Sequence, residues 1–209
     1  MTLDQILSAF VGEATQCDKL IADAHQKDAS GTMVFPPTDR AQITVAALLN
    51  LYIAWEIFLE SSLLEFMVGS ATRSGRVPVR FVCPVSAESA QSIVIGCNWS
   101  GHFDYGNRDY VRTIVNSYFE DGYPFEPCLD GISSELGDLK IMRNASAHRS
   151  ITTQRPLEIV AKRIFGVPRP NIDLYALLIN MDPRSTPGNT VYTTYRDKLL
   201  VTAELILNG

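Results

Sequence analysis

Apolar residues recur three or four positions apart over most of the chain, the spacing that places side chains on one face of an α-helix. This pattern predicts a helix over residues 2–27, with Thr2 as its N-cap, and a second helix from Asp39 to Val68. A loop containing Ser30-Gly31 and Pro36-Pro37 separates the two. The same spacing predicts later helices, which cover residues 110–118, 133–149, 156–165, 171–181 and 191–207.

The segment from residue 70 to residue 106 breaks this helical pattern. It contains two short β-branched runs, VPVRFVCPV and SIVIGCNWS, separated by SAESAQ. The runs fit either a small hairpin or a loop around a short helix. We therefore expect an all-α, antiparallel helical bundle made of one domain, 1–209. It would carry an irregular insertion at 70–106 and a C-terminal helical extension over 156–209.

Composition favours a globular chain with its own core. The chain has 209 residues, of which 46% are hydrophobic, and no uninterrupted apolar run approaches the roughly 20 residues of a membrane span. The first residues, MTLDQILSAF, lack the basic and apolar regions of a signal peptide. The cysteines are scattered without a close pair, which fits a reducing compartment and argues against a zinc site. We expect a cytoplasmic protein that does not contact a membrane and needs no metal or cofactor.

Charge is unevenly distributed along the chain. Between Lys140 and Pro170 seven basic residues stand against one acid, so this segment has a net charge of +6 and the remainder −11, for a total of −5. An overall acidic charge argues against a protein that coats nucleic acid. The basic segment has two interpretations, a solvated helix face or a local binding surface for an anion.

The basic segment begins with the stretch IMRNASAHRS, from Ile141 to Ser150, which combines an arginine, an amide and a histidine. On a helical wheel Arg143 falls among the apolar positions of the predicted helix 133–149, and Asn144 and His148 fall close together on another face. A buried arginine requires a carboxylate. Glu56 is the candidate, because it lies within the apolar stripe of LYIAWEIFLE in the second helix. We therefore expect a buried Arg143–Glu56 pair, although such a pair could serve only to fix helix register.

His148 also has a structural interpretation. A histidine near the C-terminal end of a helix commonly favours the helix dipole, and Ser150 and Thr152 indicate that the helix ends nearby. Three histidines occur in the chain, His25, His102 and His148, and only His148 follows an arginine in this pattern.

The RNASAH sequence, with its histidine five residues after the arginine, resembles the signature of HEPN domains (higher eukaryotes and prokaryotes nucleotide-binding). The segment LYIAWEIFLESSLLEFM resembles the long second helix of the RiboL-PSP-type HEPN families. The resemblance covers roughly residues 1–165 and implies an all-α homodimer that acts as a metal-independent endoribonuclease of a toxin–antitoxin or antiviral defence system. It also implies RNA as substrate, a possible antitoxin or other partner protein, and a catalytic set of Arg143, Asn144, His148 and the supporting acid Glu56.

The residue types suit this chemistry. RNA carries its own nucleophile, the 2′-OH, so cleavage requires a proton acceptor near neutral pH and a cation for the negative charge that develops on phosphorus. Histidine and arginine meet these needs. One chain supplies one such histidine, and a dimer would supply both a base and an acid. Two alternatives remain: a non-catalytic HEPN-like interaction or regulatory module, and a purely structural helical dimer. Signatures of P-loop, Rossmann, G-x-S-x-G and H-E-x-x-H enzymes are absent from the sequence.

Overall fold

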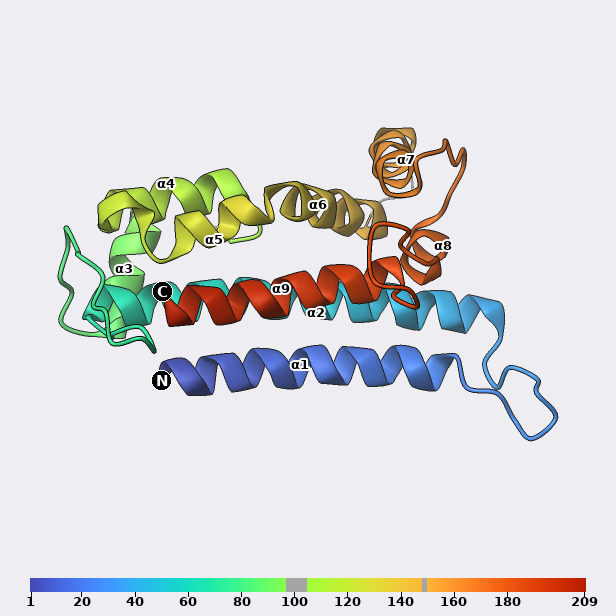
Figure 1. Ribbon diagram of the computed structural model, residues 1–209, viewed down its shortest axis with the longest axis horizontal. Coiled ribbons are helices and arrows are strands. Elements are labelled where there is room, and N and C mark those ends of the chain that lie inside the picture. Colours follow the sequence, from blue (N-terminus) through green and yellow to red (C-terminus); the bar gives the residue numbers. More distant parts are fainter. Residues whose placement is uncertain (97–104, 148–149) are drawn as a thin grey trace. The chain divides into compact units, whose positions relative to one another are not determined.

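The computed structural model describes residues 1–96, 105–147 and 150–209, and over these residues it is all-α, without a β-strand (Figure 1). The predicted fold class is therefore confirmed. The described helices, in chain order, are α1 (Leu3–Ala24), α2 (Pro37–Val68), α3 (Ala87–Gly96), α4 (Arg108–Tyr118), the short 3₁₀-helix η1 (Glu120–Gly122), α5 (Phe125–Gly131), α6 (Ser133–Ala147), α7 (Ile151–Phe165), α8 (Leu174–Ile179) and α9 (Val191–Asn208).

The chain divides into two compact units. Unit 1 contains Met1–Val11, Ala54–Leu136 and Leu199–Gly209, and unit 2 contains Gly12–Ile53 and Gly137–Lys198. Helices α1, α2, α6 and α9 each contribute residues to both units. The predicted C-terminal extension supplies buried side chains to each unit, among them Val160, Ile164, Leu177 and Tyr195 in unit 2 and Ala203 and Ile206 in unit 1.

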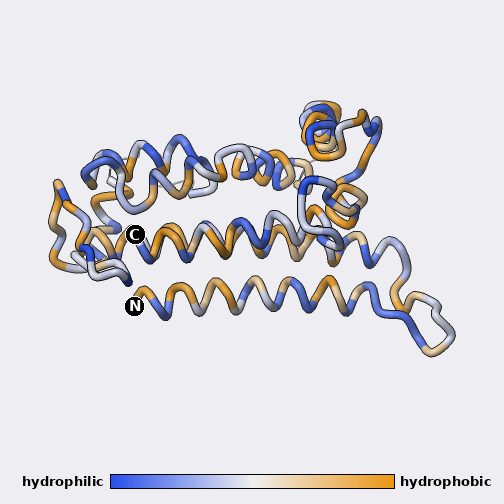
Figure 2. The backbone as a smooth tube through the Cα atoms, in the orientation of Figure 1, coloured by the Kyte–Doolittle hydropathy of each residue, from blue (hydrophilic) through white to orange (hydrophobic). Residues whose placement is uncertain are grey.

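Helix α1 begins where the sequence predicts it. Thr2 accepts a hydrogen bond at Oγ1 from the backbone N–H of Gln5, and the Gln5 side chain accepts one from the Thr2 N–H. This reciprocal pair satisfies two of the donors that every helix start leaves open. Along α1 the buried residues follow the helical spacing, so orange and blue segments alternate along its tube in Figure 2.

Helix α2 is the apolar helix of the structure. It begins at Pro37, two residues before the predicted start, because proline is well tolerated in the first turn, where its missing N–H has no helical partner. Among the described helices, α2 alone is long and apolar enough to cross a membrane, judged by length and composition. The expectation that no uninterrupted apolar run reaches this length still holds, because α2 contains charged residues such as Glu56 and Glu60. Half of the window is buried within the protein, as in the core helix of a globular domain.

The core of unit 1 contains two groups of aromatic rings. The Phe10 ring lies 5.8 Å from the Trp55 ring and 5.4 Å from the Phe58 ring, measured between centroids. The Phe66 and Phe125 rings meet edge to face at 5.7 Å. Pairs at these separations contribute about 0.5–1.5 kcal/mol each beyond the burial of their area. The contact between Phe66 and Phe125 holds α5 within this unit. The sequence pattern did not predict this helix.

The insertion in unit 1 is a loop followed by a short helix, so the second of the two predicted alternatives holds for its described part. Residues 77–85 form no helix, and Arg80 forms one antiparallel bridge with Phe119. Two backbone hydrogen bonds flank the bridge, from Phe81 N–H to Tyr118 O and from Glu120 N–H to Val79 O. The chain then enters α3. Residues 97–104 lie outside the described part.

Helix α7 begins five residues before its predicted start at 156. Ser150 and Thr153 form a reciprocal cap at its N-terminus, and the helix includes Pro156 in its second turn. The helix ends at Gly166, whose φ of 73° lies in the left-handed region that favours glycine. Helix α8 is shorter than predicted, because Asp173 caps it by accepting a hydrogen bond from the Ala176 N–H.

Candidate functional site

Arg143 lies in the last two turns of α6, and its side chain is exposed. The prediction that Arg143 is buried in an apolar stripe is therefore wrong. Its guanidinium group donates a hydrogen bond from Nη1 to Oδ1 of Asn144 at 3.3 Å. A solvated guanidinium needs no buried carboxylate, so the expected buried pair with Glu56 loses its physical basis.

The error has an identifiable cause, because the buried face of α6 includes acidic residues. Asp138 is only 3% exposed, and Met142 is fully buried. With Arg143 at 0° on the wheel, Asp138 falls at about 220° and Met142 at about 260°, which moves the centre of the buried face to about 300°. When only the apolar residues of α6 are counted, the centre of the predicted buried face falls closer to Arg143 on the wheel. The arginine instead stands at the border of the buried face, from which its long side chain reaches water.

The end of α6 holds its polar side chains close to one another. Asn144 is half-buried and accepts the hydrogen bond from Arg143, and Ser146 donates a hydrogen bond from Oγ to the Arg143 carbonyl oxygen at 2.6 Å. Because Asn144 uses its carbonyl oxygen for Arg143, its NH₂ group remains as a donor. The structure thus brings together two of the four predicted site residues, Arg143 and Asn144.

The structure does not test the other two predicted site residues. His148 lies outside the described residues, as does Arg149. Glu56 is half-buried on α2 and belongs to unit 1, whereas Arg143 belongs to unit 2. The roles of His148 and Glu56 therefore stay predictions.

A cavity of about 770 Å³ adjoins this end of α6 within unit 2. Its wall begins at Ala145 and Ser146, the two residues that follow Asn144. One side is formed by small and aliphatic residues of α2, and the remainder by α7 and the segment that leads into α8. A volume of a few hundred Å³ with an apolar floor and a few polar groups is typical of a small-molecule site. The remaining lining residues include Ala41, Gln42, Val45, Ala46, Leu49, Ser150, Ile151, Thr153, Gln154, Leu157, Asn171, Asp173, Leu174 and Tyr175.

Sequence reasoning missed this cavity, because its lining comes from segments that lie far apart in the sequence, residues 41–49 and residues 145–175. It also missed the contact that holds one wall in place. His25 on the loop after α1 lies 2.8 Å from the Ile21 carbonyl oxygen through Nδ1 and 3.0 Å from the Tyr175 hydroxyl through Nε2, and the two rings stack. Since a carbonyl only accepts, Nδ1 carries the proton, and in the neutral ring Nε2 accepts from Tyr175.

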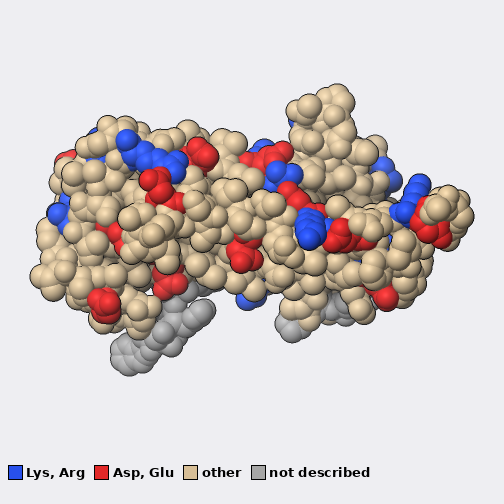
Figure 3. Space-filling view, turned by 90° about the horizontal axis from the view of Figure 1, so that it is seen from below, with Lys and Arg blue, Asp and Glu red and all other residues tan. Residues whose placement is uncertain are grey.

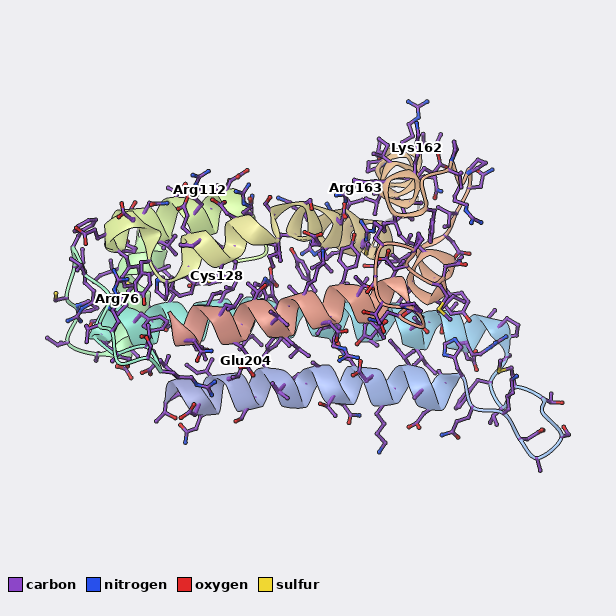
Figure 4. The ribbon with its side chains drawn as sticks, in the orientation of Figure 1. Arg76, Arg112, Cys128, Lys162, Arg163 and Glu204 are labelled. Atoms are coloured by element: carbon purple, nitrogen blue, oxygen red, sulfur yellow. The ribbon has the colours of Figure 1, made fainter. Side chains whose placement is uncertain are left out.

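Two arginines of the basic segment contact other side chains of unit 2. Arg163 forms an ion pair with the buried Asp138, and Arg169 lies over the Phe165 ring at 5.1 Å. Figure 4 shows Arg163 directed toward α6 and Lys162 directed away from α7 into solvent. Arg155 is also exposed on α7. The local positive charge of unit 2 is therefore carried by exposed side chains on α6 and α7.

The charges elsewhere are mixed in sign. On the face drawn in Figure 3, acidic and basic side chains are interspersed. A generic nucleic-acid coating surface would gather one sign.

Comparison with protein-family models, with curated proteins and with solved structures finds no match for this chain.

Proposed function

We propose that the protein is a cytoplasmic, metal-independent endoribonuclease of the HEPN type that acts in a toxin–antitoxin or antiviral defence system. The observation that carries this proposal is the accessible Arg143–Asn144 pair at the end of α6, beside a cavity large enough for a nucleotide. The exposure of Arg143 strengthens the proposal, because a guanidinium that is paired in a core cannot reach a phosphate.

The proposed reaction assigns one role to each residue. His148 removes the proton from the 2′-OH, whose oxygen attacks phosphorus, and the bond from phosphorus to the 5′ oxygen breaks. Arg143 binds the two non-bridging oxygens, where negative charge increases in the transition state. Asn144 positions the guanidinium through its hydrogen bond. The products are a 2′,3′-cyclic phosphate and a 5′-hydroxyl, which takes up one proton.

That last proton requires a second acid. We propose that the partner subunit's His148 supplies it in a homodimer, with Glu56 supporting the site as an acid. Exposed apolar side chains in unit 2, Ile53 on α2 and Ile151 at the start of α7, offer a surface that a second copy would cover.

One observation favours the second candidate function, a non-catalytic interaction module. In segment 77–85 of unit 1, every second side chain is exposed to solvent, and these side chains are apolar or carry a thiol. Phe81 is 61% and Val85 96% exposed. Exposed apolar surfaces of this kind mark protein interaction sites. The exposed residues are Val77, Val79, Phe81, Cys83 and Val85.

A cleavage assay in EDTA separates the two candidates. The purified protein should cut single-stranded RNA, leave 2′,3′-cyclic phosphate ends, and spare DNA of the same sequence, which lacks the 2′-OH. His148→Ala should lower the rate by roughly 10²–10⁴-fold. Lys19→Ala serves as the control, because it removes an exposed cation from α1, which contributes no residue to the proposed site. Activity that persists in His148→Ala, or that requires a divalent metal, contradicts the proposed mechanism.

A further inference from the structure

The cavity of unit 2 has a floor suited to a flat ring. Its α2 side consists of small and aliphatic side chains, including Ala41, Val45 and Ala46, and Leu157 of α7 adds to it. Among the described residues that line it, there is no lysine or arginine, and Asp173 contributes a carboxylate. The lining therefore suits an uncharged planar group better than a phosphate.

The polar atoms at the rim are held by hydrogen bonds whose direction can be assigned. Gln154 donates from Nε2 to the Ile172 carbonyl oxygen at 2.9 Å and to Oε1 of Glu158 at 3.2 Å. Both of these partners only accept, so the amide orientation is fixed and Oε1 remains as an acceptor. Glu158 also accepts from the Asn171 N–H at 2.8 Å, which holds it in place.

Two further acceptors lie on the same cavity lining. Asp173 accepts from the Ala176 N–H through Oδ1, which leaves Oδ2 as an acceptor. Tyr175 donates its hydroxyl proton to His25, which leaves lone pairs on its oxygen. Three positioned side chains of the cavity, Gln154, Asp173 and Tyr175, thus present acceptors to a ligand.

A ligand that matches this rim carries several N–H donors on a flat ring. Among the RNA bases, guanine carries the most, since N1–H and the 2-amino group stand side by side, whereas uracil offers the single N3–H. Exposed cations outside the cavity, Arg155 and Lys162 on α7 and Arg143 on α6, complement the negative phosphates on either side of such a base.

We propose that this cavity binds an unpaired guanine base of the RNA substrate and thereby directs cleavage to guanine-containing single strands. The inference rests on the proposed function for its link to cleavage. The binding of the base itself is a separate property, and it can be measured without catalysis.

The binding test uses the His148→Ala variant, in which cleavage cannot intervene, and three mononucleotides: guanosine, inosine and uridine 5′-monophosphate. Inosine monophosphate is the matched ligand, because it lacks only the 2-amino group of guanosine monophosphate. Ligand-detected NMR should give a guanosine monophosphate affinity roughly tenfold or more above that for inosine monophosphate, as expected for a lost hydrogen bond to a charged group. Binding to uridine monophosphate should be weaker still.

Two protein variants test the location. Asp173→Asn retains a good helix cap but replaces one acceptor by a donor, so it should reduce the preference for guanosine over inosine monophosphate to near one. Ala46→Trp fills the cavity from an exposed helix position and should abolish binding. Ala22→Trp, an exposed alanine on α1 outside the lining, is the matched control and should bind like the parent.

The outcomes separate this inference from the proposed function. Guanine-dependent binding without cleavage of any RNA by the wild-type protein would support the cavity assignment and contradict the nuclease. Cleavage that shows no guanine preference, and that Ala46→Trp leaves unchanged, would overturn the cavity assignment and leave the nuclease standing. Equal binding of all three mononucleotides, or no binding of any, would likewise overturn it.

Discussion

Tyr195 on α9 donates a hydrogen bond from its hydroxyl group to Oδ2 of Asp138 on α6, at a distance of 2.5 Å. The same carboxylate forms an ion pair with Arg163 of α7. Asp138 is almost completely buried, and a buried carboxylate is tolerated only when it is paired and hydrogen-bonded. These contacts therefore connect three helices of unit 2, and they hold α6 in the orientation that leaves Arg143 in solvent.

Removing the Tyr195 hydroxyl should destabilise the protein. Tyr195→Phe deletes a hydrogen bond to a charged group in a buried site, so the free energy of unfolding should fall by about 1.5–3 kcal/mol. Urea unfolding followed by circular dichroism measures this change.

Tyr192→Phe is the control for that measurement. Tyr192 is buried on the same helix, and its hydroxyl does not meet the geometry of a hydrogen bond in the described part of the chain. This variant should change the free energy of unfolding by less than about 1 kcal/mol. Equal losses for the two variants would show that the Tyr195–Asp138 bond contributes nothing beyond packing.

Asp182 should make the stability of unit 2 depend on acid pH. Burial alone would raise its pKa, but hydrogen bonds from the Arg184 side chain and backbone, together with the arginine charge, outweigh burial and hold the pKa below its ordinary value of 3.8. The folded state therefore favours the ionised form. Its contribution to stability is fully present above pH 3.8 and is lost as the pH falls through the lower pKa of the folded state.

The matched variant is Asp182→Asn, which cannot ionise. At pH 7 it should be less stable than the parent by about 1–3 kcal/mol, and this difference should shrink as the pH falls below about 4. Urea unfolding at several pH values between neutral and acid compares the two proteins. A constant difference at all pH values would contradict the assigned role of the carboxylate.

Arg143→Ala should separate activity from stability. Because Arg143 is exposed and hydrogen-bonds only to its neighbour Asn144 in the described part of the chain, its loss should change the free energy of unfolding by at most about 0.5 kcal/mol. RNA cleavage should nevertheless fall by roughly 10²-fold or more, as for the loss of a donor that stabilises transition-state charge. A large loss of stability would instead mean that Arg143 has a structural partner.

The helices could be predicted from sequence to the extent that apolar spacing determines them. The caps at Thr2 and Gly166 set their boundaries closely, because capping is local chemistry. Helix α5 was missed, since its seven residues are too few to show a period and include a proline at position 127.

The candidate site was harder to predict because it depends on tertiary contacts. Asp138 forms a buried hydrogen bond with Tyr195, which lies 57 positions away in the sequence. Because Asp138 is buried, the face of α6 that packs in the core differs from the face that its apolar residues indicate. The same kind of contact, between His25 and Tyr175, shapes the cavity wall. From sequence alone, a polar residue on a helix is assigned to the surface unless its interaction partner is known. No local sequence pattern identifies that partner.

Phe10 should be among the side chains on which the stability of unit 1 depends most. It is 2% exposed and contacts the rings of Trp55 and Phe58, so Phe10→Ala removes both ring contacts and leaves a cavity. The expected loss is about 3–5 kcal/mol, a large part of the stability of a domain of this size. Near-UV circular dichroism should also change, because Trp55 loses the asymmetric environment of its neighbour. Val11→Ala is the control at the adjacent position, where the side chain is 40% exposed and truncation should cost less than about 1 kcal/mol. If the two variants unfolded at the same urea concentration, the aromatic group around Phe10 would not be the stabilising core of the unit.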